Sequence, residues 1–191
     1  MTTREFWDRH AATFDDEPDH GLREPRVRDA WARLLLPLVP AGSSALDLGC
    51  GTGSLSVLLA EAGHDVHGVD LSEEMIKAAR AKASAAGLSI DFAVGDAAHP
   101  RGSFDVVLAR HLLWALPDPA AALGRWVSVL RTGGVLLLVE GRWSTGAGLT
   151  ADETRRLVLG VRAEAEVTPL TDEDLWGRPI ADERYLVVSR R

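Results

Sequence analysis

Several features that define other protein classes are scarce in this sequence, and each shortage excludes something. Its 191 residues include a single cysteine, Cys50, which excludes an internal disulfide and a thiolate metal cluster. No apolar run approaches the roughly 20 residues of a membrane span. The first ten residues, MTTREFWDRH, are charged and lack the apolar core of a signal peptide, so we expect a cytoplasmic protein.

Positive charge is also in short supply. Lysine and arginine number 21 against 28 acidic residues, giving a net charge of −7. Binding to nucleic acid or to anionic membranes needs basic patches, so neither partner is expected. The 46% hydrophobic and 26% charged fractions are ordinary for a soluble globular protein, and the length favours one domain spanning 1–191.

From about residue 44 onward, apolar strand-like runs alternate with helical patterns. Helices are expected to begin near Thr52, at Ser72, at Asp118–Pro119 and at Thr150, where capping signals occur. Gly63, Gly87 and Gly133 are interpreted as helix stops. The predicted strands are 44–50, 64–71, 89–96, 104–111, 134–141, 163–170 and 183–190.

This alternation predicts an α/β fold, a doubly wound parallel sheet with helices on both faces. The linker between the last two strands is too short for a crossover helix, so the last strand is expected to be antiparallel. Residues 1–40 contain two predicted helices, 3–16 and 23–38, which we interpret as a helical cap on the core 41–191.

The most informative stretch is DLGCGTG, in which glycine recurs at positions 49, 51 and 53 after Asp47. Such spacing suits neither a strand nor a helix, and it predicts a ligand close to the backbone at the end of the first strand. The dinucleotide fingerprint requires Gly or Ala where this chain has Ser54. Asp47 would repel a pyrophosphate and attract an ammonium group, which disfavours a nicotinamide cofactor.

Residues 45–72, ALDLGCGTGSLSVLLAEAGHDVHGVDLS, resemble the first two motifs of the class I S-adenosylmethionine (SAM)-dependent methyltransferases, a Rossmann-like family. The segment GDA at 95–97, after the third predicted strand, supports the same resemblance. The resemblance implies SAM as cofactor, with S-adenosylhomocysteine as product, and a seven-stranded sheet in the order 3-2-1-4-5-7-6.

The resemblance also implies roles for ten cofactor-binding residues. Gly49, Gly51 and Gly53 would admit the methionine and ribose portions, Asp47 would hold the ammonium group, and Asp70 would accept hydrogen bonds from the ribose hydroxyls. The remaining five complete the set: Leu71 and Met75 against the adenine, Asp96 with Ala97 at its amino edge, and Arg110 near the methionine carboxylate or the sulfonium.

The acceptor side is less defined, because methyl transfer needs a base only when the nucleophile arrives protonated. His111 and His20 are the candidate catalytic residues. The acidic segment 15–19 suits either a cationic acceptor or a solvated loop. The other histidines lack ligand-like spacing, so no metal site is expected. An apolar pocket is predicted from aromatic residues at strand ends and in the cap: Trp7, Phe14, Trp114 and Trp143, with Trp176 as a further candidate.

These features favour a methyltransferase acting on a small molecule. The segment between the fifth and sixth strands leaves little room for a substrate-binding lid, so recognition would fall to the cap, the loop after the fourth strand and residues 175–179. RHLL at that loop differs from the Asn/Asp-Pro-Pro-aromatic motif of nucleic-acid-methylating relatives. A homodimer could complete the pocket. Two alternatives stay open: a nicotinamide-dependent oxidoreductase and a non-catalytic SAM-binding module.

Overall fold

The strands form one seven-stranded sheet in the order β3-β2-β1-β4-β5-β7-β6, as predicted. The structure is a computed structural model that describes residues 2–190. The pairs β1–β2, β2–β3 and β4–β5 are parallel, whereas β7 is antiparallel to both β5 and β6. Contacts divide the chain into two units, one ending at Ala97 but including 172–179, the other holding 98–171 and the residues from Ile180. The single domain over 1–191 therefore stays a prediction.

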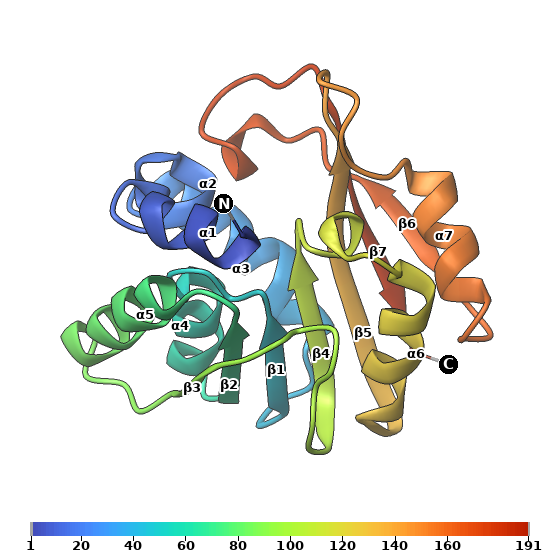
Figure 1. Ribbon diagram of the computed structural model, residues 1–191, viewed down its shortest axis with the longest axis horizontal. Helices are drawn as coiled ribbons and strands as arrows, with labels where there is room; N and C mark the ends of the chain where they lie inside the picture. Colours follow the sequence, from blue (N-terminus) through green and yellow to red (C-terminus); the bar gives the residue numbers. More distant parts are fainter. Residues whose placement is uncertain (1, 191) are drawn as a thin grey trace. The chain divides into compact units, whose positions relative to one another are not determined.

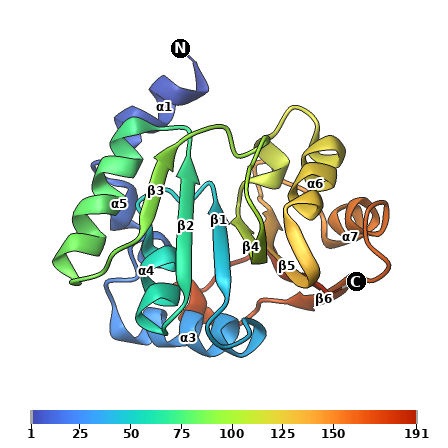
Figure 2. The same cartoon turned by 90° about the horizontal axis from the view of Figure 1, so that it is seen from below.

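The first unit contains the cap and the first three strands. Figure 2 shows β1, β2 and β3 side by side, with α5 packed along β3. Its elements are α1 (Thr3–His10), η1 (Phe14–Asp16), α2 (Pro18–Gly21), α3 (Pro25–Leu35), η2 (Leu36–Leu38), β1 (Ser44–Leu48), α4 (Ser54–Glu61), β2 (Asp65–Asp70), α5 (Glu73–Ala85), β3 (Asp91–Val94) and η4 (Glu173–Leu175).

The cap is more broken than predicted. The helix expected over 3–16 ends at His10, and two short turns follow it. The residue before a proline favours extended backbone, and Glu17 and Glu24, before Pro18 and Pro25, both adopt it. The helix expected over 23–38 is therefore limited to α3 and the short η2.

Helices α4 and α5 pack together over the strands of this unit. One apolar cluster joins the two helices to β3: Val57, Ile76, Ala79, Ala83 and Phe92. Helix α1 of the cap lies against α5, as Figure 1 shows in blue and green. The predicted N-cap of α5 is confirmed, since the Ser72 hydroxyl accepts the backbone N–H of Met75 at 3.1 Å.

The second unit contains the other four strands. Helix α6 packs on β5, and α7 lies next to α6 and packs on β6 and β7 (Figure 2). The predicted caps at Asp118 and at Thr150 with Glu153 are confirmed. Its elements are β4 (Phe104–Arg110), η3 (Leu113–Ala115), α6 (Pro119–Ser128), β5 (Leu130–Arg142), α7 (Ala151–Leu159), β6 (Glu166–Pro169) and β7 (Glu183–Ser189).

The interpretation of Gly133 as a helix stop is wrong. Helix α6 ends at Ser128, and Gly133 lies inside β5, which begins at Leu130. The β4–β5 register shifts at this point, with Phe104 opposite Leu130 but Val106 opposite Val135. The glycine has a positive φ of 78° and belongs to this irregularity, a position that glycine suits.

Among residues 2–190, every helix is too short or too polar to span a membrane.

Candidate functional site

The backbone conformation of the loop between β1 and α4 explains why glycine recurs at every second position. Gly49, Gly51 and Gly53 have positive φ values of 66°, 54° and 76°. Residues other than glycine rarely adopt this left-handed backbone conformation, because their Cβ atom is crowded there. The loop is fixed at its base, where the backbone N–H groups of Gly49 and Cys50 both donate to the carbonyl of Val69.

The second and third glycines have different neighbours. A Cβ on Gly51 would lie 3.0 Å from a ring carbon of Phe14, so the cap approaches the backbone there. A Cβ on Gly53 would lie 2.9 Å from both Ala79 and Phe92, within the α5–β3 packing. The absence of a side chain at Gly53 thus already has a packing reason, and its cofactor role stays a prediction.

Asp70, the last residue of β2, connects the glycine loop to the start of α5. Its two carboxylate oxygens accept the backbone N–H groups of Gly51 and Ser72, each at 2.9 Å. Burial raises the pKa of Asp70, and these backbone hydrogen bonds offset only part of the effect. A carboxylate has about four acceptor positions, so Asp70 can receive further donors, as the predicted ribose hydroxyls would be.

Asp47 is buried at the foot of the same loop. Its Oδ2 accepts a hydrogen bond of 2.6 Å from the Ser56 hydroxyl on α4. Burial raises the pKa of the Cys50 thiol well above its usual value, and the charges of Asp47 and Asp70 raise it further. Cys50 is therefore a neutral thiol in this structure. Two carboxylates near the loop give it a negative potential, which fits a cationic ligand and opposes a pyrophosphate.

The predicted adenine-side residues are unequally accessible. Leu71 is half-buried, whereas the Met75 side chain is only 1% exposed and offers almost no free surface. Asp96 is exposed and Ala97 is buried. The N–H of Gly95 donates to the carbonyl of Asp70 at 2.8 Å, so the segment after β3 begins beside Asp70.

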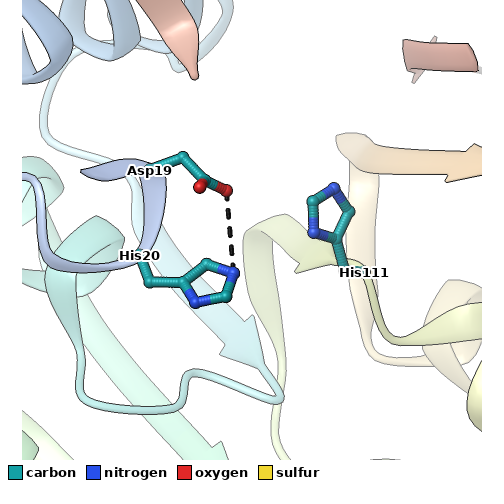
Figure 3. Close-up of side chains that lie close together, drawn as sticks. All are labelled: Asp19, His20 and His111. Carbon is teal, nitrogen blue, oxygen red and sulfur yellow. Dashed lines mark ion pairs between the residues drawn. The ribbon is translucent and has the colours of Figure 1, made fainter. Parts of the chain in front are cut away.

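Three predicted residues of the cap form one aromatic cluster. The ring of Phe14 stacks on His20, with 4.2 Å between centroids, and Trp7 meets Phe14 edge-on at 6.2 Å. His20 Nε2 lies 3.7 Å from the Asp19 carboxylate, the ion pair dashed in Figure 3. Because Phe14 also lies against Gly51, this cluster borders the predicted cofactor loop.

Two carboxylates of the cap attach it to the cofactor loop region: Asp15, which the sequence placed only in the acidic segment 15–19, and Asp8, which the sequence did not single out. Asp15 pairs with Lys82 Nζ on α5 at 2.8 Å and accepts the Thr52 hydroxyl at 2.5 Å. Burial raises the pKa of Asp15, but the hydrogen bonds from Lys82 and Thr52 outweigh this effect and leave the pKa below its ordinary value. Asp8 on α1 accepts the Ser72 hydroxyl at 2.6 Å. We call the group Asp15, Thr52 and Lys82 the clasp.

The acidic segment 15–19 is largely neutralised. Besides Asp15 in the clasp, Asp16 lies 3.4 Å from Arg23, and Glu17 lies 2.9 Å from Arg178. Asp19 pairs with His20 when the histidine is protonated. Ion pairs with basic side chains thus reduce the negative charge of the segment, while Asp16 stays exposed to solvent, and the two interpretations stay predictions.

The expectation that Trp176 lines a pocket is wrong. Its side chain is buried and meets Trp31 edge-on, with 5.6 Å between the ring centroids. The Trp31 Nε1–H donates to the carbonyl of Leu175 at 2.7 Å. This part of the segment 175–179 is therefore packed against α3.

In the second unit, the turn after β4 holds the predicted residues Arg110 and His111. Arg110 ends β4 opposite Val139 of β5 and is half-buried. His111 follows it (Figure 3) with φ of +55°, one of two non-glycine residues between 2 and 190 in the left-handed region. Such a conformation costs about 1–2 kcal/mol and marks a position that its surroundings constrain.

His111, Trp114 and Trp143 form an aromatic group in this unit, which we call the aromatic wall. Trp143 meets His111 edge-on and Trp114 at a tilt, each with 5.2 Å between centroids. The Arg184 guanidinium lies over the Trp143 ring at 4.8 Å. Arg184 was not predicted as a site residue, because it lies far from the aromatic wall along the chain. Glu140 was not predicted either, although an acid at the end of the apolar run VLLLVE is a recognisable signal.

The sheet order and the glycine loop at the end of β1 agree with the fold of the class I SAM-dependent methyltransferases. Residues 46–138 match the family described as a methyltransferase domain. This match, together with the sheet order, relates the chain to the class I, Rossmann-like SAM-dependent methyltransferases, a family whose methyl donor is SAM.

Similar proteins include two named ubiquinone biosynthesis O-methyltransferase. The one from Xanthomonas axonopodis pv. citri is 37% identical over 137 residues, covering 70% of this chain and 54% of the relative. The one from Thiobacillus denitrificans is 36% identical over 134 residues, covering 68% and 54%. The chain thus spans about half the length of the curated relatives it matches.

Solved structures share the fold at lower identity. The SAM-bound magnesium protoporphyrin IX methyltransferase of Synechocystis PCC 6803 has a TM-score of 0.70 and 23% identity, covering 86% of this chain and 78% of the other. SpnF, described as a [4+2]-cyclase, has a TM-score of 0.72 and 19% identity, covering 85% and 81%. Since one of these proteins is named for a cyclisation, the fold alone does not establish methyl transfer.

Proposed function

We propose that this protein transfers the methyl group of SAM to a small-molecule acceptor, with a hydroxylated aromatic ring as the acceptor class. The observation that supports the cofactor most directly is the hydrogen bond between the Gly51 N–H and Asp70. In this hydrogen bond the Asp70 carboxylate, which can accept further hydrogen bonds, lies beside the glycine loop. The negative charges of Asp47 and Asp70 near the loop favour a cationic ligand. A bound SAM supplies a methyl group activated by its sulfonium.

The chain's own residues would bind and orient the donor. Asp70 would accept the ribose hydroxyls, Asp47 would hold the ammonium group, and Gly49 and Gly51 would leave the backbone accessible. The proposed roles of the other five residues are those predicted from the sequence, although the Met75 side chain is only 1% exposed: Leu71, Met75, Asp96, Ala97 and Arg110. Because alignment and exclusion of water supply most of the acceleration in such a displacement, no dedicated catalytic triad is required.

Two observations support an aromatic acceptor. The aromatic wall presents rings that stack favourably on a flat acceptor. The relatives from Xanthomonas and Thiobacillus are named as O-methyltransferases. His111 or His20 would accept the hydroxyl proton, and Trp7 and Phe14 would bound the donor side. The acidic net charge supports the absence of a nucleic-acid partner, and a homodimer stays a prediction that light scattering would test.

The direct experiment is transfer of labelled methyl from SAM to a panel of hydroxylated aromatic acids, aliphatic amines and thiols. We expect label on the phenolic compounds, with S-adenosylhomocysteine released in equal amount. Label confined to amines or thiols would contradict the acceptor class. Tight S-adenosylhomocysteine binding with no turnover on the panel or on a metabolite extract would favour the non-catalytic alternative.

A further inference from the structure

Strand β5 carries, near its end, a buried carboxyl group that the predicted site does not use. Glu140 is fully buried, and its Oε1 accepts the backbone N–H groups of Leu112 and Leu113 at 3.0 and 2.7 Å. Its Oε2 is also buried and has no hydrogen-bond partner among residues 2–190. Burying a carboxyl group is costly, and burial raises the pKa of Glu140 to about 8, although the two hydrogen bonds oppose the rise.

The two N–H groups that Glu140 receives belong to the start of the turn η3. The first N–H groups of such a turn have no partner within it and need an acceptor from elsewhere. His111 directly precedes them, and its own N–H donates to the carbonyl of Val139 at 2.8 Å. Adjacent residues of β5 therefore hold both sides of the strained His111 backbone.

This turn orients two members of the aromatic wall. The Trp114 Nε1–H donates to the carbonyl of His111 at 3.1 Å, so the indole direction follows the His111 backbone. Trp143, which contacts both rings, lies three residues after Glu140 on the same strand and its extension. A change at Glu140 would thus reach the wall through the turn.

We propose that Glu140 is a positioning residue for the acceptor, which fixes the turn 111–115 and thereby the rings of His111 and Trp114. The inference rests on the proposed function, because it takes the aromatic wall as the acceptor's surface. Its role is separable from cofactor binding. A loss at Glu140 should therefore affect acceptor KM and not the affinity for S-adenosylhomocysteine.

The test compares Glu140→Met, which removes the acceptor oxygen, with Glu140→Gln, which retains it, and with Glu166→Met at an exposed position of β6. Hydrogen exchange of the Leu112 and Leu113 amides should accelerate at least tenfold in Glu140→Met and stay within threefold in the other two. Acceptor KM, measured with the best phenol of the panel, should rise about tenfold in Glu140→Met only. Binding of S-adenosylhomocysteine should be unchanged in all three.

Unchanged exchange at Leu112 and Leu113 in Glu140→Met, or a rise in acceptor KM that Glu140→Gln shares fully, would overturn the proposal. If Glu140→Met does not fold, Glu140→Asp, which withdraws the oxygen by one methylene, should show the same pattern in weaker form. A wild-type protein with no turnover would contradict the proposed function, while the exchange rates would still decide whether Glu140 holds the turn.

Discussion

Lys82 on α5 and Asp15 in the cap form an ion pair with 2.8 Å between Nζ and Oδ2. Both side chains are less than one quarter exposed, and both bond to Thr52 in the glycine loop. The cap is therefore attached to the cofactor loop by charge-assisted hydrogen bonds and not only by apolar contacts.

Removing this pair should weaken the fold measurably. Lys82→Met leaves Asp15 with Thr52 and Arg23 as its partners among residues 2–190. We expect a loss of roughly 1–2 kcal/mol in the free energy of unfolding by urea, as for a partly buried pair. Lys77→Met on the same helix is the control, because Lys77 is exposed and its ion pair with Glu74, at 3.6 Å, lies on the surface. Equal effects of the two substitutions would show that the clasp adds no more to the free energy of unfolding than an exposed ion pair does.

An alanine substitution should destabilise the fold more at Gly51 than at Gly87, although both glycines have a positive φ. Gly51→Ala places a Cβ against Phe14, whereas Gly87, with φ of +69°, has no atom within 4 Å of that position. We expect Gly87→Ala to cost about 1 kcal/mol from strain alone. Gly51→Ala should cost more and weaken S-adenosylhomocysteine binding. Adding Phe14→Ala should recover part of the stability; no recovery would contradict the contact.

The raised pKa of Glu140 predicts a pH-dependent difference in stability between the wild type and Glu140→Gln. Between pH 4.5 and about 8 the folded chain keeps a proton that the unfolded chain releases. Wild-type stability therefore falls as pH rises through this window, whereas glutamine does not titrate.

We expect Glu140→Gln to gain on the wild type across that window by up to a few kcal/mol, at about 1.4 kcal/mol per pKa unit. Urea unfolding at pH 5, 6.5 and 8 measures this difference. Parallel stabilities at the three pH values would show that the Glu140 carboxyl titrates near its ordinary pKa.

The left-handed backbone of His111 predicts that His111→Gly and His111→Ala differ in stability although both lose activity. His111→Gly relieves the strain and His111→Ala does not, so the glycine variant should be about 1 kcal/mol more stable than the alanine variant. Both should lose turnover if the imidazole accepts the hydroxyl proton. Full activity in either variant would remove His111 from the chemistry and leave His20 as the candidate base.

The sequence predicted the succession of helices and strands because capping residues and apolar strands are local signals, whereas the strand order in the sheet followed from the family resemblance. Asp118, Thr150 and Ser72 cap helices as expected. The failures depend on distant partners. Gly133 follows a helix pattern but lies in an irregular strand pairing, and Trp176 looked like a pocket residue until Trp31 covered it. The clasp joins residues 15, 52 and 82, which no spacing relates.

The central claim is that the glycine loop and Asp70 bind the nucleoside of SAM, and calorimetry with S-adenosylhomocysteine tests it most directly. We expect micromolar binding to the wild type and a loss of at least about 30-fold, roughly 2 kcal/mol, in Asp70→Ala. Asp65→Ala, at the exposed start of β2, should bind normally. No binding to the wild-type protein, or binding of NAD(H) in its place, would contradict the account.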